Sequence, residues 1–250
     1  MTYDVITRAR RTTRRRLIAV GLAAAAAAGA VTVAVVAGTD PSRSVTLPAD
    51  PAPDRPDIGT ADGGRADLPS DLGWADVAGV SVPVSGQSGP RLTVGGQARG
   101  FAHDHAGAVL AAAHIIVRVN PQVGPAVFES TLLRQVVGPD AAAMRVQVAQ
   151  AYDELRNQAG IKDGQPIGRL YANLRGYRIL SYTDDEVIVR LLTEAPDASG
   201  SSLMVSTEVS VRWTGSDWAL VAPAGGTFDQ VVTAASDSDI ATFLPFTAGG

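Results

Sequence analysis

The spacing of hydrophobic and polar residues changes twice along the chain. An uncharged, mostly apolar run extends from Leu17 to Ala37. Between residues 105 and 160 the apolar positions recur at helical spacing, and from residue 177 onward apolar and polar positions alternate, as they do in strands. The pattern therefore predicts one long apolar helix, then several amphipathic helices, then a sheet.

The region of helical spacing divides into three segments at residues that stop helices. We expect helices over residues 105–119, 125–137 and 141–159, separated by Asn-Pro and Gly-Pro pairs. Asp104 and Asp140 stand where N-caps are expected, because a short polar side chain there can accept a backbone N–H. Gly160 is expected to end the third helix.

The alternating region predicts a meander of strands joined by short turns. Residues 177–182, 186–194, 205–213 and 217–222 carry the alternation, and Asp184-Asp185 and Gly215-Ser216 mark turns. Helices first and strands second indicate an α+β fold, with three helices packed on one face of a curved antiparallel sheet. Residues 74–90 are punctuated by Pro and Gly, so we expect an extended, loop-rich entry to the domain.

Composition divides the chain into four parts. Residues 1–16 contain six arginines and predict a basic cytoplasmic tail. Residues 17–37 reach the roughly 20 residues that a transmembrane helix needs. Residues 38–73 are rich in proline and aspartate and predict a disordered linker. The remaining residues, 74–250, are enough for one extracytoplasmic domain.

The N-terminal segment has two readings. Arg14, Arg15 and Arg16 directly precede Leu17, so the positive-inside rule places the N-terminus in the cytoplasm and the domain outside the cell. The same arginines also resemble a twin-arginine export motif, and Ala28-Gly29-Ala30 has the form of a cleavage site. We favour a retained anchor, because the apolar run continues past that site to Ala37.

Charge and cysteine content exclude several classes of protein. The 250 residues carry a formal net charge of −4 and no cysteine. A lipoprotein anchor and disulfides are therefore excluded, and the core alone must stabilise the domain. A mildly acidic domain gives no electrostatic reason to bind nucleic acid, and the basic tail is expected to lie on anionic lipid.

Three histidines raise the question of a metal site. His103, Asp104, His105 and His114 include ligand types that suit zinc. His105 and His114 are nine residues apart, which places them on different faces of a helix. We therefore expect His103 and His105 at the surface, His114 at a polar edge of the helix, and neither a metal nor another cofactor.

Four aromatic residues are candidates for a pocket or an interface. Tyr152 and Tyr171 are of the type that enzymes use to hydrogen-bond a substrate, and Trp213 and Trp218 flank a hairpin turn. For Tyr152 we expect core packing with its hydroxyl at the rim, and for the tryptophans cross-strand packing. The chain has no phosphate loop, nucleophile elbow or zinc-protease motif, so we expect no catalytic residues and no enzyme activity.

Three stretches resemble a known family. They are WADVAGVSVPVSGQSGP from residue 74, GFAHDHAGAVLAAAHI from residue 100, and FLPF at 243–246. They look like an uncharacterised family of actinobacterial membrane proteins whose genes commonly occur in integrative conjugative elements, although Phe246 stands where that family is expected to have tryptophan. The order of helices and strands also resembles the nuclear-transport-factor-like cone, also called the cystatin-like or ketosteroid-isomerase-like fold.

The resemblance implies a role. A short cytoplasmic tail, one spanning helix, a linker and a cone-shaped external domain match the layout of VirB-type scaffold components of type IV secretion machines. Such components act by contacts with the cell membrane, with other transfer-apparatus proteins and with further copies of themselves. The alternative is an exported soluble cone-fold domain, released by cleavage of a twin-arginine signal, that binds or converts a small ligand.

Overall fold

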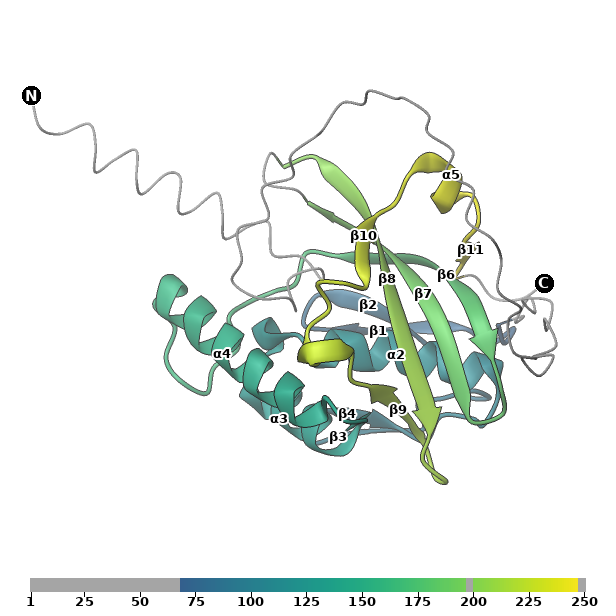
Figure 1. The fold of residues 1–250 in the computed structure, drawn as a ribbon, viewed down its shortest axis with the longest axis horizontal. Helices are drawn as coiled ribbons and strands as arrows, with labels where there is room; N and C mark the ends of the chain where they lie inside the picture. The colour runs from purple at the N-terminus through teal and green to yellow at the C-terminus, as the bar shows by residue number, and fades with distance from the viewer. Residues whose placement is uncertain (1–67, 197–199, 247–250) are drawn as a thin grey trace, which may run out of the picture.

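The computed structural model describes residues 68–196 and 200–246 (Figure 1). The predicted tail, the predicted transmembrane helix and the linker up to residue 67 lie outside the described residues. Within the described ranges, no helix is both long and apolar enough to cross a membrane.

The described chain begins with strands, continues with helices and ends with a sheet. Two hairpins come first, β1 (Gly73–Val77) with β2 (Val80–Val84) and β3 (Leu92–Val94) with β4 (Gln97–Arg99). The helical part comprises α2 (His105–Arg118), the short 3-10 helix η2 (Pro121–Val123), α3 (Pro125–Arg134), the strand β5 (Val136–Val137) and α4 (Ala141–Ala159). The last part comprises β6 (Asn173–Tyr182), β7 (Glu186–Pro196), β8 (Ser202–Trp213), β9 (Trp218–Val221), η3 (Ala224–Gly226), β10 (Val232–Ala234), α5 (Asp237–Ile240) and β11 (Leu244–Pro245).

The three predicted helices are confirmed, and the start of the first and the end of the third are those that the sequence indicates. Asp104 caps α2, because its Oδ1 accepts the N–H of Gly107 at 2.7 Å. Gly160 ends α4 in the left-handed conformation, with φ 67°. Asp140 precedes α4 as expected, but its side chain makes no capping hydrogen bond.

The main sheet is mixed, which corrects the prediction of a purely antiparallel sheet. Its seven strands run in the order β11-β6-β7-β8-β9-β5, with β10 also paired to β8. The pairs are antiparallel except β5 with β9, where Val136 lies opposite Leu220 in a parallel register. The predicted second helix is shorter than expected for this reason: α3 ends at Arg134, and the two valines that follow join the sheet. The α+β class is confirmed.

The entry to the domain is more regular than predicted. Residues 73–84 form the hairpin β1–β2 instead of loops, and a second hairpin follows at residues 92–99. Both turns need left-handed backbone, which Gly79 supplies at φ 98° in the first and Gly95 at φ 56° in the second. Each strand has only three to five residues, too few to show a clear period in the sequence.

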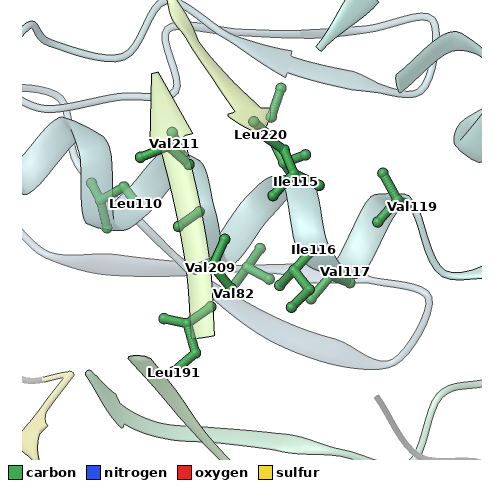
Figure 2. Packing of buried hydrophobic residues seen from close by; sticks show 14 of the residues in the cluster. Val82, Leu110, Ile115, Ile116, Val117, Val119, Leu191, Val209, Val211 and Leu220 are labelled. Atoms are coloured by element: carbon green, nitrogen blue, oxygen red, sulfur yellow. The ribbon is translucent and has the colours of Figure 1, made fainter. Parts of the chain in front are cut away.

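The core is built around α2. All residues of this helix after His105 are buried, and it contacts β2 as well as the main sheet. Figure 2 shows Leu110 and Ile115 of the helix close to Val209 and Val211 of β8, with Val82 of β2 nearby. A helix that is buried on all sides need not have the polar face that marks a surface helix.

The C-terminal segment returns across the sheet. It leaves β10 beside β8 and reaches β11 beside β6, so it passes over β7 on the way (Figure 1). Arg178 of β6 holds this segment, because its Nη1 donates to Thr242 Oγ1 at 2.8 Å. Phe246 is buried, with its ring 5.2 Å from that of Tyr177 and 6.4 Å from that of Trp74. The FLPF ending therefore anchors the end of the described chain.

Candidate functional site

A groove of about 620 Å³ lies beside the start of β6. Its walls come from three distant stretches of sequence: Gly79 in the β1–β2 turn, residues 169–173, and residues 194–196 with 200–202. Sites for small molecules have volumes of about 300–1,000 Å³, so the groove is large enough to accept a ligand or a protruding side chain. Tyr171 lies in this groove, and it is 64% exposed.

Backbone contacts fix the segment that presents Tyr171. The Leu170 N–H donates to the Ala78 carbonyl oxygen at 2.7 Å, and the Leu170 side chain is buried. A Cβ at Gly79 would overlap the side chain of Arg169, so this glycine serves both the turn and the close approach of the arginine. Tyr171 therefore extends from an ordered backbone.

The charges in the groove differ between its walls. Glu194 accepts from Ser202 Oγ at 2.5 Å and forms an ion pair with Arg175 at 3.6 Å. Arg169 makes no ion pair or hydrogen bond that involves its side chain within the described ranges. The groove therefore has one neutralised wall and one cation that is free to meet a ligand or a partner.

A second hollow, of about 390 Å³, continues from the first. It is lined by Trp74, Ser81, Leu174 and Arg175, and Asn173 lines both hollows. On this side of β6, β11 pairs only with Gly176 and Tyr177. Among residues 68–196 and 200–246, no strand pairs with residues 173–175 on this side, so they form a strand edge between the exposed side chains of Trp74 and Tyr171.

The two tryptophans lie at the other end of the sheet. Trp213 and Trp218 face each other across the β8–β9 hairpin with ring centroids 5.5 Å apart. The His103 ring stacks on Trp213 at 4.0 Å, and its Nε2 lies 2.6 Å from the Asp184 carbonyl oxygen. The Trp218 indole N–H donates to the Ala102 carbonyl oxygen at 2.8 Å. This cluster joins the start of α2 to two hairpin turns.

Comparison with known proteins gives one match. A family model described as a domain of unknown function, DUF8175, matches residues 36–243. The chain belongs to this family. No curated protein and no solved structure matches it significantly. The matched range of the DUF8175 chain begins at residue 36, at the end of the apolar run, and includes the proline-rich segment that precedes the domain.

In this DUF8175 chain Tyr152 is a packing residue. Its ring contacts Phe128 at 5.5 Å, it is 3% exposed, and its hydroxyl donates to the Gln165 carbonyl oxygen at 2.9 Å. The neighbouring Asp153 pairs with Arg156 at 2.9 Å on the exposed face of α4. Tyr152 and Asp153 both line a hollow of about 400 Å³ beside α4, but the hydroxyl of the first is bound to a backbone oxygen and the carboxylate of the second to Arg156.

The prediction that His114 lies at a polar edge is wrong, because α2 has no polar edge there. His114 is fully buried, its Nε2 donates to the Pro83 carbonyl oxygen at 2.8 Å, and its Nδ1 accepts from Arg118 at 2.8 Å. Burial, together with the positive charge of Arg118, lowers the pKa of His114 to about 3. Burial also lowers the pKa of Arg118 to about 10, so the arginine stays charged at neutral pH. The pair is a buried structural contact between α2 and β2.

The four aromatic candidates do not converge on one site. Tyr171 lies in the groove, Tyr152 packs between α3 and α4, and Trp213 and Trp218 belong to the hairpin cluster. Nor do the histidines converge: across residues 68–196 and 200–246, no three His, Asp or Glu side chains are grouped to hold a metal ion. Sequence reasoning missed Trp74, which only the fold brings to the adjoining hollow. It also missed Arg169 and Asn173, which are two positions from Tyr171 but carry no local sign of the groove.

Proposed function

We propose that this DUF8175 chain is a single-pass membrane protein with a non-catalytic domain outside the cell membrane. Residues 17–37 would be the retained anchor and residues 1–16 the cytoplasmic tail. The spacer would be residues 38–67, shorter than the predicted 38–73, because Leu68 is buried in the core and Gly73 begins β1. The domain would act as a scaffold component of a conjugative, type IV secretion-like apparatus. Its partners would be the membrane, other envelope proteins of that apparatus and further copies of the chain.

The observation that carries the proposal is the filled interior of the domain. Enzymes with a cone-shaped fold bind and convert their substrates between helix and sheet, where an acid and a hydrogen-bonding group lie close together. Here that space is occupied by α2, whose Leu110 and Ile115 are fully buried against β8 and β9. A solid interior with exposed aromatic residues outside it favours contacts with other proteins over conversion of a substrate.

The cone analogy is the finer part of the proposal. Helices that precede a long antiparallel meander support it, as does the packing of α2 against the sheet. The parallel β5–β9 pair and the returning strands β10 and β11 would be additions to that plan. The proposed scaffold role comes from the resemblance to VirB-type components.

The groove beside Tyr171 favours a second candidate function. Its volume suits a small ligand, and Arg169 provides a cation that no described acid neutralises. An exported domain with a cleaved signal could bind an anionic molecule there. The arrangement lacks a paired acid and base, so binding fits this groove better than conversion.

Transfer of a conjugative element tests the scaffold function. The gene would be deleted from an element that carries it, and transfer frequency would be measured after complementation. We expect the deletion to abolish transfer, the full chain to restore it, and a secreted version lacking residues 1–37 to fail, since a scaffold must stay in the membrane. Unchanged transfer after deletion, or full rescue by the secreted version, would contradict the proposal.

A further inference from the structure

The uncovered edge of β6 lies on a surface with both protruding and hollow parts. Tyr171 is 64% exposed beside the 620 Å³ groove, and Trp74 is 49% exposed beside the 390 Å³ hollow. Between them, β11 leaves residues 173–175 of β6 unpaired on that side. Backbone N–H and C=O groups at an uncovered edge can pair with another strand.

Protrusions and hollows that lie side by side suit one kind of partner. In a two-fold interface the same patch occurs on both molecules, so each copy must supply what the other copy receives. The groove is large enough to take an aromatic side chain, and Tyr171 stands at its border. A second copy, rotated by the two-fold axis, would place its own Tyr171 opposite the groove.

The charges on this surface point to the same partner. Arg169 and Arg175 are positive, while Glu194 and Asp76 are negative, and Asp76 lies two residues from Trp74 on the same face of β1. A strongly acidic or basic partner would meet like charge on part of such a surface. An identical surface can match both signs.

We propose that this surface, made of Trp74, Arg169, Tyr171, residues 173–175 and Glu194, binds the same surface of a second copy of the chain. The two β6 edges lie side by side, and Tyr171 of each copy enters the groove of the other. Because the uncovered edge is only three residues long, the aromatic side chains supply most of the affinity. The inference rests on the proposed scaffold function and names its contact between copies.

Cross-linking through a single cysteine tests this contact. The chain has no cysteine, so Asn173→Cys places a single thiol at the position that lines both hollows. In membranes that contain the full chain, we expect a short bis-maleimide to give covalent dimers. The matched control is Ser216→Cys, exposed in the turn at the far end of β8, which should give none.

A second pair of variants tests the tyrosine. Tyr171→Ala in the Asn173→Cys background should lower the yield of cross-linked dimer about tenfold, as truncation of a central interface tyrosine does. Leu133→Ala is the control, because Leu133 is 63% exposed on α3 and lies outside the proposed surface. Absence of dimers with Asn173→Cys, or equal yields with and without Tyr171, would overturn the proposal.

Two readouts separate this inference from the scaffold function. Differently tagged full-length copies would be co-purified from membranes in parallel with the cross-linking. If they co-purify while Asn173→Cys gives no cross-link, the surface is wrong and the scaffold function stands. If the chain is found cleaved and soluble but still cross-links through Asn173, the contact between copies stands and the scaffold function is wrong.

Discussion

At the residue scale, Asp217 connects segments that are more than a hundred positions apart. Its carboxylate accepts the Gly100 N–H at 2.7 Å, the Phe101 N–H at 3.2 Å and the Trp218 N–H at 3.0 Å. These hydrogen bonds attach the strand that leads into α2 to the β8–β9 hairpin. One charged acceptor thus satisfies three backbone donors.

Replacement of this carboxylate should destabilise the domain. We expect Asp217→Ala to lower the free energy of unfolding by about 2–4 kcal/mol, because partly buried N–H groups lose a charged acceptor. Urea denaturation of the full chain would measure this loss of unfolding free energy. Asp184→Ala is the control, since Asp184 contributes its backbone oxygen and not its carboxylate to the bond with His103. Equal stability of the two variants would contradict this role.

His114 should make stability depend on pH. Its pKa is about 3 in the folded chain, against an ordinary value of 6.5, mainly because burial disfavours the charged ring. Between these values the unfolded state binds a proton that the folded state does not, so the folded state loses stability as pH falls. We expect this loss to approach about 1.4 kcal/mol per pH unit below pH 6.

A conservative variant isolates the histidine. His114→Gln keeps a donor for Pro83 and an acceptor for Arg118 but cannot titrate. The two proteins share all other titratable groups, so the difference in their unfolding free energies, measured from pH 7 to pH 5, reports His114 alone. The variant should show the flatter dependence. Parallel curves would mean that His114 titrates normally in the folded state.

Some residue roles can be predicted from the sequence and others cannot. Asp104 and Gly160 act within one helical turn of their own position, so local rules identify them correctly. The burial of His114 depends on β2 packing against a side of α2 that an amphipathic helix would expose. The sequence around His114 did carry a sign of this burial: residues 106–117 are almost all small or apolar, so the helix has no polar face.

At the element scale, the first turn of α2 packs closely against the segment that precedes it. In an exposed helix, replacing Gly by Ala raises the free energy of unfolding by about 0.5–1 kcal/mol. At Gly107 a Cβ would overlap the carbonyl oxygen of Ala102, which is backbone and cannot move aside easily. We therefore expect Gly107→Ala to destabilise the chain by about 1–3 kcal/mol. A rise in the thermal unfolding midpoint would contradict this packing.

The elements differ in how well the sequence predicts them. The meander β6–β9 could be predicted, because alternation over residues 177–182, 186–194, 205–213 and 217–222 marks strands with one buried face. The hairpins β1–β2 and β3–β4 could not, since their strands are short and their register depends on glycine turns. The parallel β5–β9 pair could not either, because its two residues meet β9 from about eighty positions away.

At the scale of the whole molecule, the candidate surface is a product of the fold. Trp74 and Tyr171 are nearly a hundred positions apart, and they line two hollows that share Asn173 because β2 packs beside β6. Tyr171 could be chosen from the sequence as an aromatic residue in a loop. Its neighbours Arg169 and Asn173 could not be chosen. Nothing local in the sequence shows that Asn173 lies at a strand edge, or that Arg169 forms no ion pair with an acid of the described residues.

The filled interior and the apolar run of residues 17–37 support the same account from opposite ends of the chain. The first places buried apolar side chains between α2 and the sheet, and the second predicts that the domain remains attached to the membrane. Both observations support the proposal that the protein is a membrane-attached scaffold. Retention of the N-terminal segment is therefore the central claim.

The most direct test is the intact mass of the protein, together with its partition between membrane and soluble fractions, after purification from its own kind of host. We expect the full-length mass, recovered in the membrane fraction and resistant to extraction by carbonate and high salt. A mass that begins at or near Val31, recovered in the soluble fraction, would contradict the account. It would identify the arginine-rich start as an export signal.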